Sequence, residues 1–164
     1  MSLRCLAVVS LTLAACSCDR PVSHRNFAPK TEFPSGEIKP FPDATEVRLF
    51  VEKDYENGRP IYTKASGLVL TKEQRRKFES TLHVQVAPEA YAACFIPHHF
   101  FRYYNESDKL LGEFSVCFCC AGIRDAEGSG IKVGKNQELS FNYAILADLV
   151  RSLGEPTDVQ CDPE

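Results

Sequence analysis

The sequence predicts an α+β domain, in which a mostly antiparallel sheet is built around a long hairpin at about residues 93–121 and two helices are added. Two apolar runs joined by a polar loop indicate the hairpin. A capping pattern and a helical spacing of aliphatic residues indicate the helices. The chain has 164 residues, of which 44% are hydrophobic, and this suits one globular core with short additional segments.

The first 15 residues are typical of a signal peptide. Their apolar run from Cys5 to Leu13 follows Arg4, and it is far shorter than the roughly 20 residues that a membrane-spanning helix needs. We therefore expect residues 1–15 to be removed on export and to take no part in the fold.

The signal segment ends in Leu13-Ala14-Ala15-Cys16, which resembles the lipobox of bacterial lipoproteins. The resemblance implies that the Cys16 thiol carries a diacylglyceryl group, that the amine freed by cleavage is acylated, and that the protein is held at a membrane facing the periplasm. Ser17 stands where an Asp would resemble an inner-membrane retention signal, and this favours the outer membrane. Ordinary secretion, with Cys16 or Cys18 in a disulfide, is the alternative.

A tether is expected over residues 16–44, after the lipid-bearing cysteine. The segment has few aliphatic residues and no periodicity, and its prolines favour an extended chain: Pro21, Pro29, Pro34, Pro40 and Pro42. We expect a single globular domain over residues 45–164.

The domain is expected to begin with a hairpin. Residues 46–52 combine β-branched and aromatic side chains with partial alternation, as an edge or half-buried strand would. Asn57-Gly58 is a strong turn signal because both residues accept a positive φ. Ile61 and Tyr62 are then expected in the partner strand.

Two helices are expected farther along the chain. Thr71 and Gln74 form the pattern Thr-x-x-Gln, in which each side chain bonds a backbone amide of the first turn, and they predict a surface helix over residues 72–82. Aliphatic residues at helical spacing predict a second helix over residues 140–153, packed against the sheet and ended by Gly154 and Pro156.

The long hairpin is expected to turn at residues 105–109. A favourable charge pair results if Arg102 lies opposite Glu113. This register also sets His98 opposite Cys117 and Ile96 opposite Cys119. It gives one face of the hairpin a shared set of side chains: His99, Phe101, Phe114, Val116 and Phe118.

A metal site is one hypothesis for the other side of the hairpin. Cys and His are ligands that suit zinc and copper, and four of them fall together near the open end: Cys94, His98, Cys117 and Cys119. Their spacing differs from the Cys-x2-Cys knuckles of zinc folds. A histidine beside aromatic residues is also more often a packing residue than a ligand.

Structural disulfides are the leading interpretation, because thiols beyond the inner membrane are oxidised. Of eight cysteines, Cys5 lies in the leader and Cys16 takes lipid, so six remain and can pair completely. The suggested pairs are Cys94 with Cys119 or Cys120, and Cys18 with Cys161. Other arrangements stay open.

A thiol redox protein is the third interpretation. A thioredoxin-like enzyme places Cys-x-x-Cys at a helix N-terminus, where the dipole activates the thiol. Cys117-x-x-Cys120 has this spacing, but it falls within an expected strand.

The cysteine and histidine segments also carry a resemblance. Ala93-Cys94-Phe95-Ile96-Pro97-His98-His99, followed by Gly112-Glu113 and Val116-Cys117-Phe118-Cys119, is similar to uncharacterised small bacterial envelope proteins. Those proteins share a Cys-x-x-Pro-x-His stretch and a later Cys-Phe-x-Cys stretch. The resemblance implies no particular activity.

Charge and motif content narrow the classes of function. The net charge of -3 leaves no excess of Lys or Arg for a nucleic-acid partner. The chain has no nucleophile elbow, His-Glu-x-x-His motif, phosphate loop or dinucleotide fingerprint. We expect a non-enzymatic envelope lipoprotein whose partners are the membrane, through its lipid, and another envelope protein.

Overall fold

The computed structural model describes residues 38–88, 95–125 and 128–161, and in this part of the chain the fold is α+β, as predicted. The larger sheet is six-stranded and antiparallel, in the order β2-β1-β5-β6-β7, with β3 also paired to β1. Its strands are β1 (Glu46–Glu56), β2 (Arg59–Tyr62), β3 (Leu68–Val69), β5 (His99–Tyr104), β6 (Leu110–Cys117) and β7 (Gly122–Asp125). A two-stranded sheet pairs β4 (Leu82–Val86) with β8 (Gln137–Phe141).

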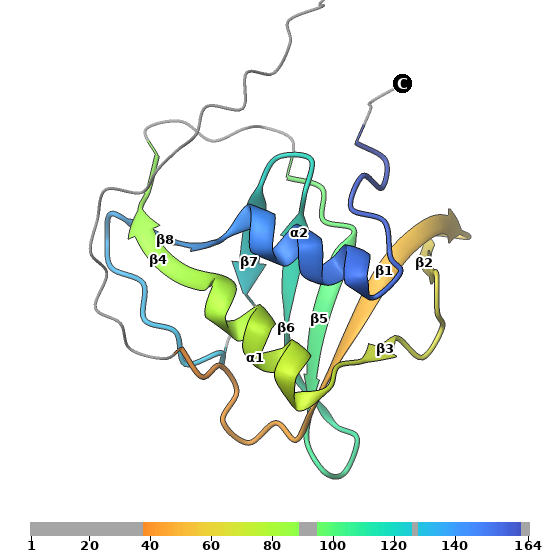
Figure 1. Cartoon of the computed structure of the whole chain (residues 1–164), viewed down its shortest axis with the longest axis horizontal. Helices are drawn as coiled ribbons and strands as arrows, with labels where there is room; N and C mark the ends of the chain where they lie inside the picture. The colour runs from red at the N-terminus through yellow and green to blue at the C-terminus, as the bar shows by residue number, and fades with distance from the viewer. Residues whose placement is uncertain (1–37, 89–94, 126–127, 162–164) are drawn as a thin grey trace, which may run out of the picture. The chain divides into compact units, whose positions relative to one another are not determined.

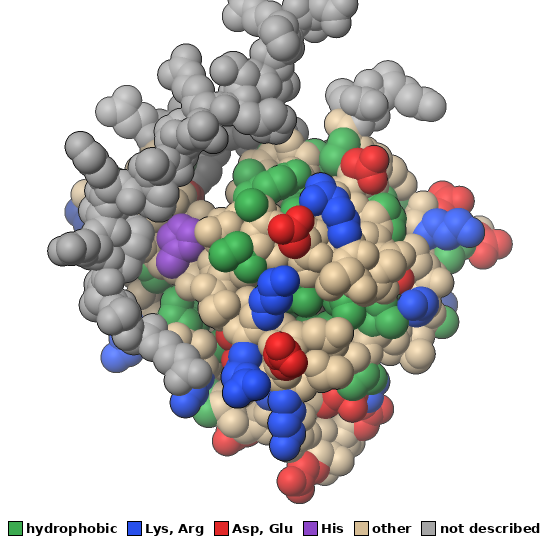
Figure 2. Space-filling model, viewed as in Figure 1, with side chains coloured by type: hydrophobic (Ala, Val, Ile, Leu, Met, Phe, Trp, Pro, Cys, Tyr) green, Lys and Arg blue, Asp and Glu red, His purple; other side chains and the backbone are tan. Residues whose placement is uncertain are grey.

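Both helices, α1 (Lys72–Thr81) and α2 (Tyr143–Ser152), lie across the same face of the larger sheet (Figure 1). No helix in the described residues is long and apolar enough to cross a membrane. Figure 2 views the molecule from the same side, and it shows positive and negative side chains interspersed over this face.

The first hairpin forms where the sequence predicts it. Asn57 and Gly58 both have a positive φ, 51° and 75°, and they reverse the chain between β1 and β2. β1 is longer than expected, and it lies inside the sheet, where β2 and β3 pair with one side and β5 with the other. The prediction of an edge or half-buried strand was therefore wrong, because four consecutive residues from Leu49 to Glu52 are buried.

The long hairpin has the predicted register in its central part. Arg102 lies opposite Glu113 in the ladder between β5 and β6, and Arg102 Nε donates to Glu113 Oε2 over 2.9 Å. The side chains expected on one face are all buried in the core or against it: His99, Phe101, Phe114, Val116 and Phe118. Among the described residues, the ladder between β5 and β6 joins His99–Tyr104 to Leu110–Val116, within the range 93–121 predicted for the hairpin.

The helices have the caps that their sequences suggest. Thr71 Oγ1 accepts from the Gln74 amide, and the Gln74 side chain accepts from the Thr71 amide, which completes the predicted capping box. The second helix begins at Tyr143 and not at residue 140, because Gln137–Phe141 is a strand and Asn142 caps the helix. The last two residues of β8, which pairs with β4, and the cap Asn142 therefore occupy the start of the predicted helix.

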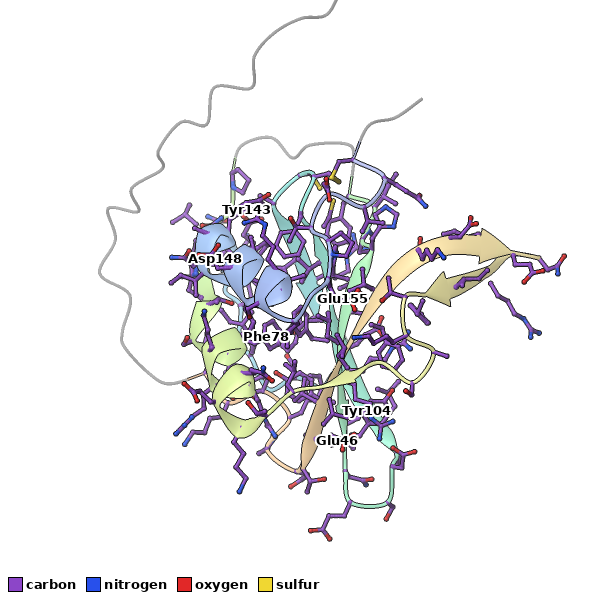
Figure 3. The ribbon with its side chains drawn as sticks, turned by 45° about the vertical axis from the view of Figure 1, so that its right-hand side comes forward. Glu46, Phe78, Tyr104, Tyr143, Asp148 and Glu155 are labelled. Carbon is purple, nitrogen blue, oxygen red and sulfur yellow. A yellow bond between two sulfur atoms is a disulfide. The ribbon has the colours of Figure 1, made fainter. Side chains whose placement is uncertain are left out.

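The core lies between the helices and the larger sheet. Phe78 of α1, labelled in Figure 3, stacks on Phe101 of β5 with ring centroids 3.9 Å apart. Phe41 is only 3% exposed and packs against Tyr103, with ring centroids 4.8 Å apart. Gly112 leaves room for it, because a Cβ atom there would lie 2.4 Å from the Phe41 ring. The folded domain thus includes residues before the boundary at residue 45 expected from the sequence.

Candidate functional site

Three cysteines gather in the turn that follows β6. The strand ends at Cys117, and β7 begins at Gly122. The intervening turn is closed by a bond from the Ala121 amide to the Phe118 carbonyl over 3.4 Å, with Ala121 at a φ of 51°. We call residues 117–121 the cysteine turn. The sequence analysis expected these residues within a strand, and this expectation was wrong for residues 118–121 because β6 ends at Cys117.

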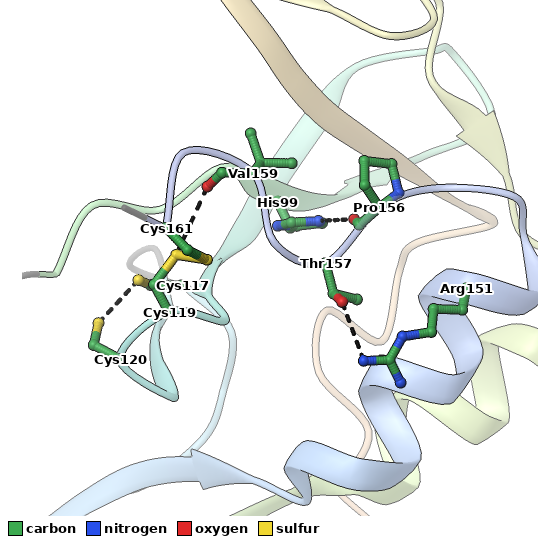
Figure 4. Close-up of a disulfide and its surroundings, with 9 residues drawn as sticks. All are labelled: His99, Cys117, Cys119, Cys120, Arg151, Pro156, Thr157, Val159 and Cys161. Atoms are coloured by element: carbon green, nitrogen blue, oxygen red, sulfur yellow. Dashed lines mark hydrogen bonds between the residues drawn. A yellow bond between two sulfur atoms is a disulfide. The ribbon is translucent and has the colours of Figure 1, made fainter. Parts of the chain in front are cut away.

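Cys119, in the cysteine turn, forms a disulfide with Cys161 (Figure 4). The two residues are 42 positions apart in sequence, and their Cα atoms are 5.1 Å apart, within the usual range for a disulfide. The bond ties the chain after α2 to the end of β6. Both residues were disulfide candidates, but the partners suggested from the sequence, Cys94 for Cys119 and Cys18 for Cys161, were wrong.

The disulfide is one of several contacts that hold residues 154–161, which we call the C-terminal segment. Arg151 of α2 donates to the Thr157 hydroxyl over 3.3 Å, and Lys64 forms an ion pair with the buried Glu155 at 3.6 Å. The Pro156 carbonyl accepts from the His99 ring over 2.7 Å. These contacts fasten the C-terminal segment to α2, to the chain between β2 and β3, and to β5.

His99 is neutral and structural in this arrangement. It is 1% exposed, its Nε2–H donates to Pro156, and its ring packs edge-on to Phe118 with centroids 4.7 Å apart. Burial lowers the pKa of His99 from 6.5 to about 4, although the bond to the Pro156 carbonyl acts in the opposite direction. Its Nδ1 is buried with no hydrogen-bond partner among the described residues.

His98 is paired with a carboxylate that the sequence analysis did not single out. Its Nδ1–H donates to Glu52 Oε1 over 3.0 Å, and the two residues are 4% and 1% exposed. The backbones also meet, since the Glu52 amide bonds the His98 carbonyl over 2.8 Å. Within the described residues, Glu52 Oε2 is buried without a hydrogen bond. A glutamate in an otherwise apolar stretch of strand was the available signal for this pair.

The predicted metal-ligand set is not brought together in the described residues. Cys119 is committed to the disulfide, and the Nδ1 atom of His98 is bonded to Glu52. Cys94 lies outside the described residues. No group of three or more His, Cys, Asp or Glu side chains that could hold a metal ion occurs in the part of the chain that the structure describes.

The side chains of Cys117 and Cys120 approach each other in the cysteine turn. Their sulfur atoms are 2.9 Å apart (Figure 4). The reversal at residues 118–121 brings both side chains to the same place, which a continuous strand would not do. The sequence shows the spacing Cys-x-x-Cys, but it does not show the turn that brings the two sulfur atoms together.

Other predicted site residues lie outside the described part of the chain. Cys16, the expected site of lipid, and Cys18 both fall there, and so does Cys94 as a partner for Cys120. Comparison with models of known protein families, with curated proteins and with solved structures finds no match for this chain.

Proposed function

We propose that this protein is a bacterial envelope lipoprotein, anchored through Cys16, whose domain is non-enzymatic and whose cysteines are mainly structural. The observation that carries the proposal is the Cys119–Cys161 disulfide in a chain whose first segment ends in a lipobox-like sequence. Disulfides persist in oxidising compartments and are rare in the cytosol, so the disulfide and the export signal support the same location.

The anchor would act through more than one acyl chain. A diacylglyceryl group on the Cys16 sulfur and a third chain on its amine bind durably, since each buried methylene contributes about 0.8 kcal/mol. The residues that follow are rich in proline and polar side chains, a composition that suits a spacer between the lipid headgroups and the domain. Ser17 favours outer-membrane placement.

The Cys119–Cys161 disulfide would stabilise the folded domain in the periplasm. A protein in the periplasm lacks cytosolic chaperones, and a covalent link between the C-terminal segment and β6 keeps that segment over the buried His99. Another envelope protein is the partner that we propose for such an anchored domain, alongside the membrane itself.

Fractionation of Cys16→Ser and Cys18→Ser variants tests the anchor. We expect the wild type and Cys18→Ser to be found in the membrane fraction, processed and labelled by radioactive fatty acid. Cys16→Ser should be unlabelled, because it lacks the sulfur that accepts the diacylglyceryl group. Cys18→Ser is the matched control, since it removes a thiol two residues away. Equal labelling of all three proteins, or labelling of none, would overturn the proposal.

A further inference from the structure

The outer side of α1 carries three exposed cations. Lys72, Arg76 and Lys77 are all exposed, and none of them forms an ion pair with a described residue. Glu73 is the exposed acid of the same helix. Figure 2 shows several Lys and Arg side chains over α1, with an acidic side chain among them. This side of the helix is therefore net positive, although the chain has a net charge of -3.

The chain enters the folded domain beside the same helix. Arg75 of α1 donates from Nη1 to the Ala44 carbonyl over 2.7 Å, and its Nε is paired with Glu79. Ala44 is buried, so the residues just before β1 are fixed against α1. Figure 1 shows this start of the described chain next to α1. The segment that follows Cys16 therefore joins the domain on the side that carries the cations.

A lipid at Cys16 would keep these cations close to a membrane surface. Residues 17–37 separate Cys16 from the first described residue, and a chain of that length reaches at most about 75 Å. A tethered group meets the surface at a much higher effective concentration than a free one. Each Lys or Arg close to an anionic surface also strengthens binding by about fivefold. Three cations on a tethered domain are therefore sufficient for docking.

We propose that α1 docks on the anionic phospholipid headgroups of the membrane that anchors the protein, through Lys72, Arg76 and Lys77. The attraction acts over a Debye length of about 8 Å at physiological ionic strength, so the helix lies directly on the headgroups. The inference rests on the anchor proposed at Cys16. It adds a second membrane contact, which sets the orientation of the domain.

The reactivity of lysines in the native protein tests this docking. The full chain, purified from the cell envelope, is reconstituted in vesicles of phosphatidylcholine, alone or with about one third phosphatidylglycerol, treated briefly with a neutral acylating reagent, and digested for mass spectrometry. We expect Lys72 to react about threefold slower or more in the anionic vesicles, because the headgroups cover the amine and favour its protonated form.

Lys53 is the internal control of this measurement. It is exposed in the hairpin of β1 and β2, which Figures 1 and 3 show away from α1. Its rate should be the same in both kinds of vesicle. A Lys72 rate that does not fall relative to the Lys53 rate in the anionic vesicles would overturn the proposal.

A matched pair of double variants assigns the effect to α1. Arg76→Gln/Lys77→Gln removes one Arg and one Lys from the helix, and glutamine is a good helix former. Lys53→Gln/Arg59→Gln removes the same two residue types from the exposed hairpin. The α1 variant should lose the slowing of Lys72, and the hairpin variant should keep it. Equal behaviour of the two variants contradicts the assignment.

Salt gives a second test that needs no variant, so it decides if the α1 variant fails to fold. The Debye length falls to about 3 Å at about 1 M salt. The slowing of Lys72 in anionic vesicles of wild-type protein should then disappear. Slowing that persists at this salt concentration would overturn an electrostatic contact.

Flotation of the same vesicles separates this inference from the proposed anchor. A protein that floats with both kinds of vesicle but shows no slowing of Lys72 has the anchor, and the docking fails. A protein that floats only with the anionic vesicles, with Lys72 slowed, has the docking surface, and the anchor at Cys16 fails. A protein that floats with neither kind overturns both proposals.

Discussion

At the scale of single residues, the buried His99 makes stability depend on pH. Burial lowers its pKa from 6.5 to about 4, so between these values the unfolded chain binds the proton more readily than the folded chain. The stabilising contribution is complete above pH 6.5, and it is lost as the pH falls toward 4. At about 1.4 kcal/mol per pKa unit, the loss amounts to about 3 kcal/mol.

Urea unfolding of the wild type and of His99→Gln checks this prediction at several pH values from 4 to 6.5. The glutamine can still donate to the Pro156 carbonyl, but it does not titrate, so the variant should show a smaller rise in stability with pH. A wild-type slope in His99→Gln would show that another group is responsible.

The Glu52–His98 pair gives a second prediction at this scale. Removal of one partner from a buried pair leaves an uncompensated polar group, and Glu52→Ala should lower the free energy of unfolding by about 3–5 kcal/mol. Glu56→Ala, at the exposed end of the same strand, should change it by less than about 0.5 kcal/mol. Chemical denaturation of the two variants measures both values. A loss in Glu52→Ala as small as that in Glu56→Ala would contradict the pairing.

At the scale of elements, the capping box should set the stability of α1. Thr71→Ala removes the acceptor for the Gln74 amide, and we expect the free energy of unfolding to fall by about 1 kcal/mol. Lys72→Ala, one residue later and exposed, serves as the control and should be nearly neutral. Thermal unfolding followed by circular dichroism compares them, and identical melting curves for the two variants would be evidence against the cap.

The elements with strong local signals could be predicted from the sequence. Asn57-Gly58 and the capping box depend on residues a few positions apart, and the register of β5 and β6 follows from one charge pair, Arg102 with Glu113. The pairing of β4 with β8 joins segments more than 50 residues apart. Neither of those strands has a distinctive turn signal beside it, so local patterns do not reveal their contact.

The candidate site was harder to predict, because its main feature is the turn at residues 118–121, which contains no Gly, Asn, Asp or Pro. Ala121 adopts a φ of 51°, which glycine or asparagine usually provides. In the sequence, the apolar residues 117–121 are therefore typical of a strand that continues from the preceding apolar run. The link between Cys119 and Cys161 is also non-local, and cysteine spacing alone does not determine connectivity. The sequence shows Glu52 as a charged residue after an apolar run, but it does not show that Glu52 pairs with His98, which is 46 positions away.

At the scale of the whole molecule, the disulfide should stabilise the domain and hold its C-terminal segment. For a loop of this length, the double variant Cys119→Ser/Cys161→Ser should lose about 2–4 kcal/mol of the free energy of unfolding. Faster amide exchange should appear in residues 154–161, since their remaining contacts are a few polar bonds and the packing of Val159 against the core. Hydrogen exchange with mass spectrometry measures this. Unchanged exchange there would mean that those bonds suffice without the disulfide.

The intact mass of the native protein, isolated from the bacterial envelope without reductant, tests the central claim most directly. The account predicts a chain that begins at Cys16, carries the added mass of a diacylglyceryl group and an acyl chain, and yields a peptide in which Cys119 is linked to Cys161. A protein that keeps Met1, or that has no lipid and a reduced Cys119, would contradict the proposed envelope role.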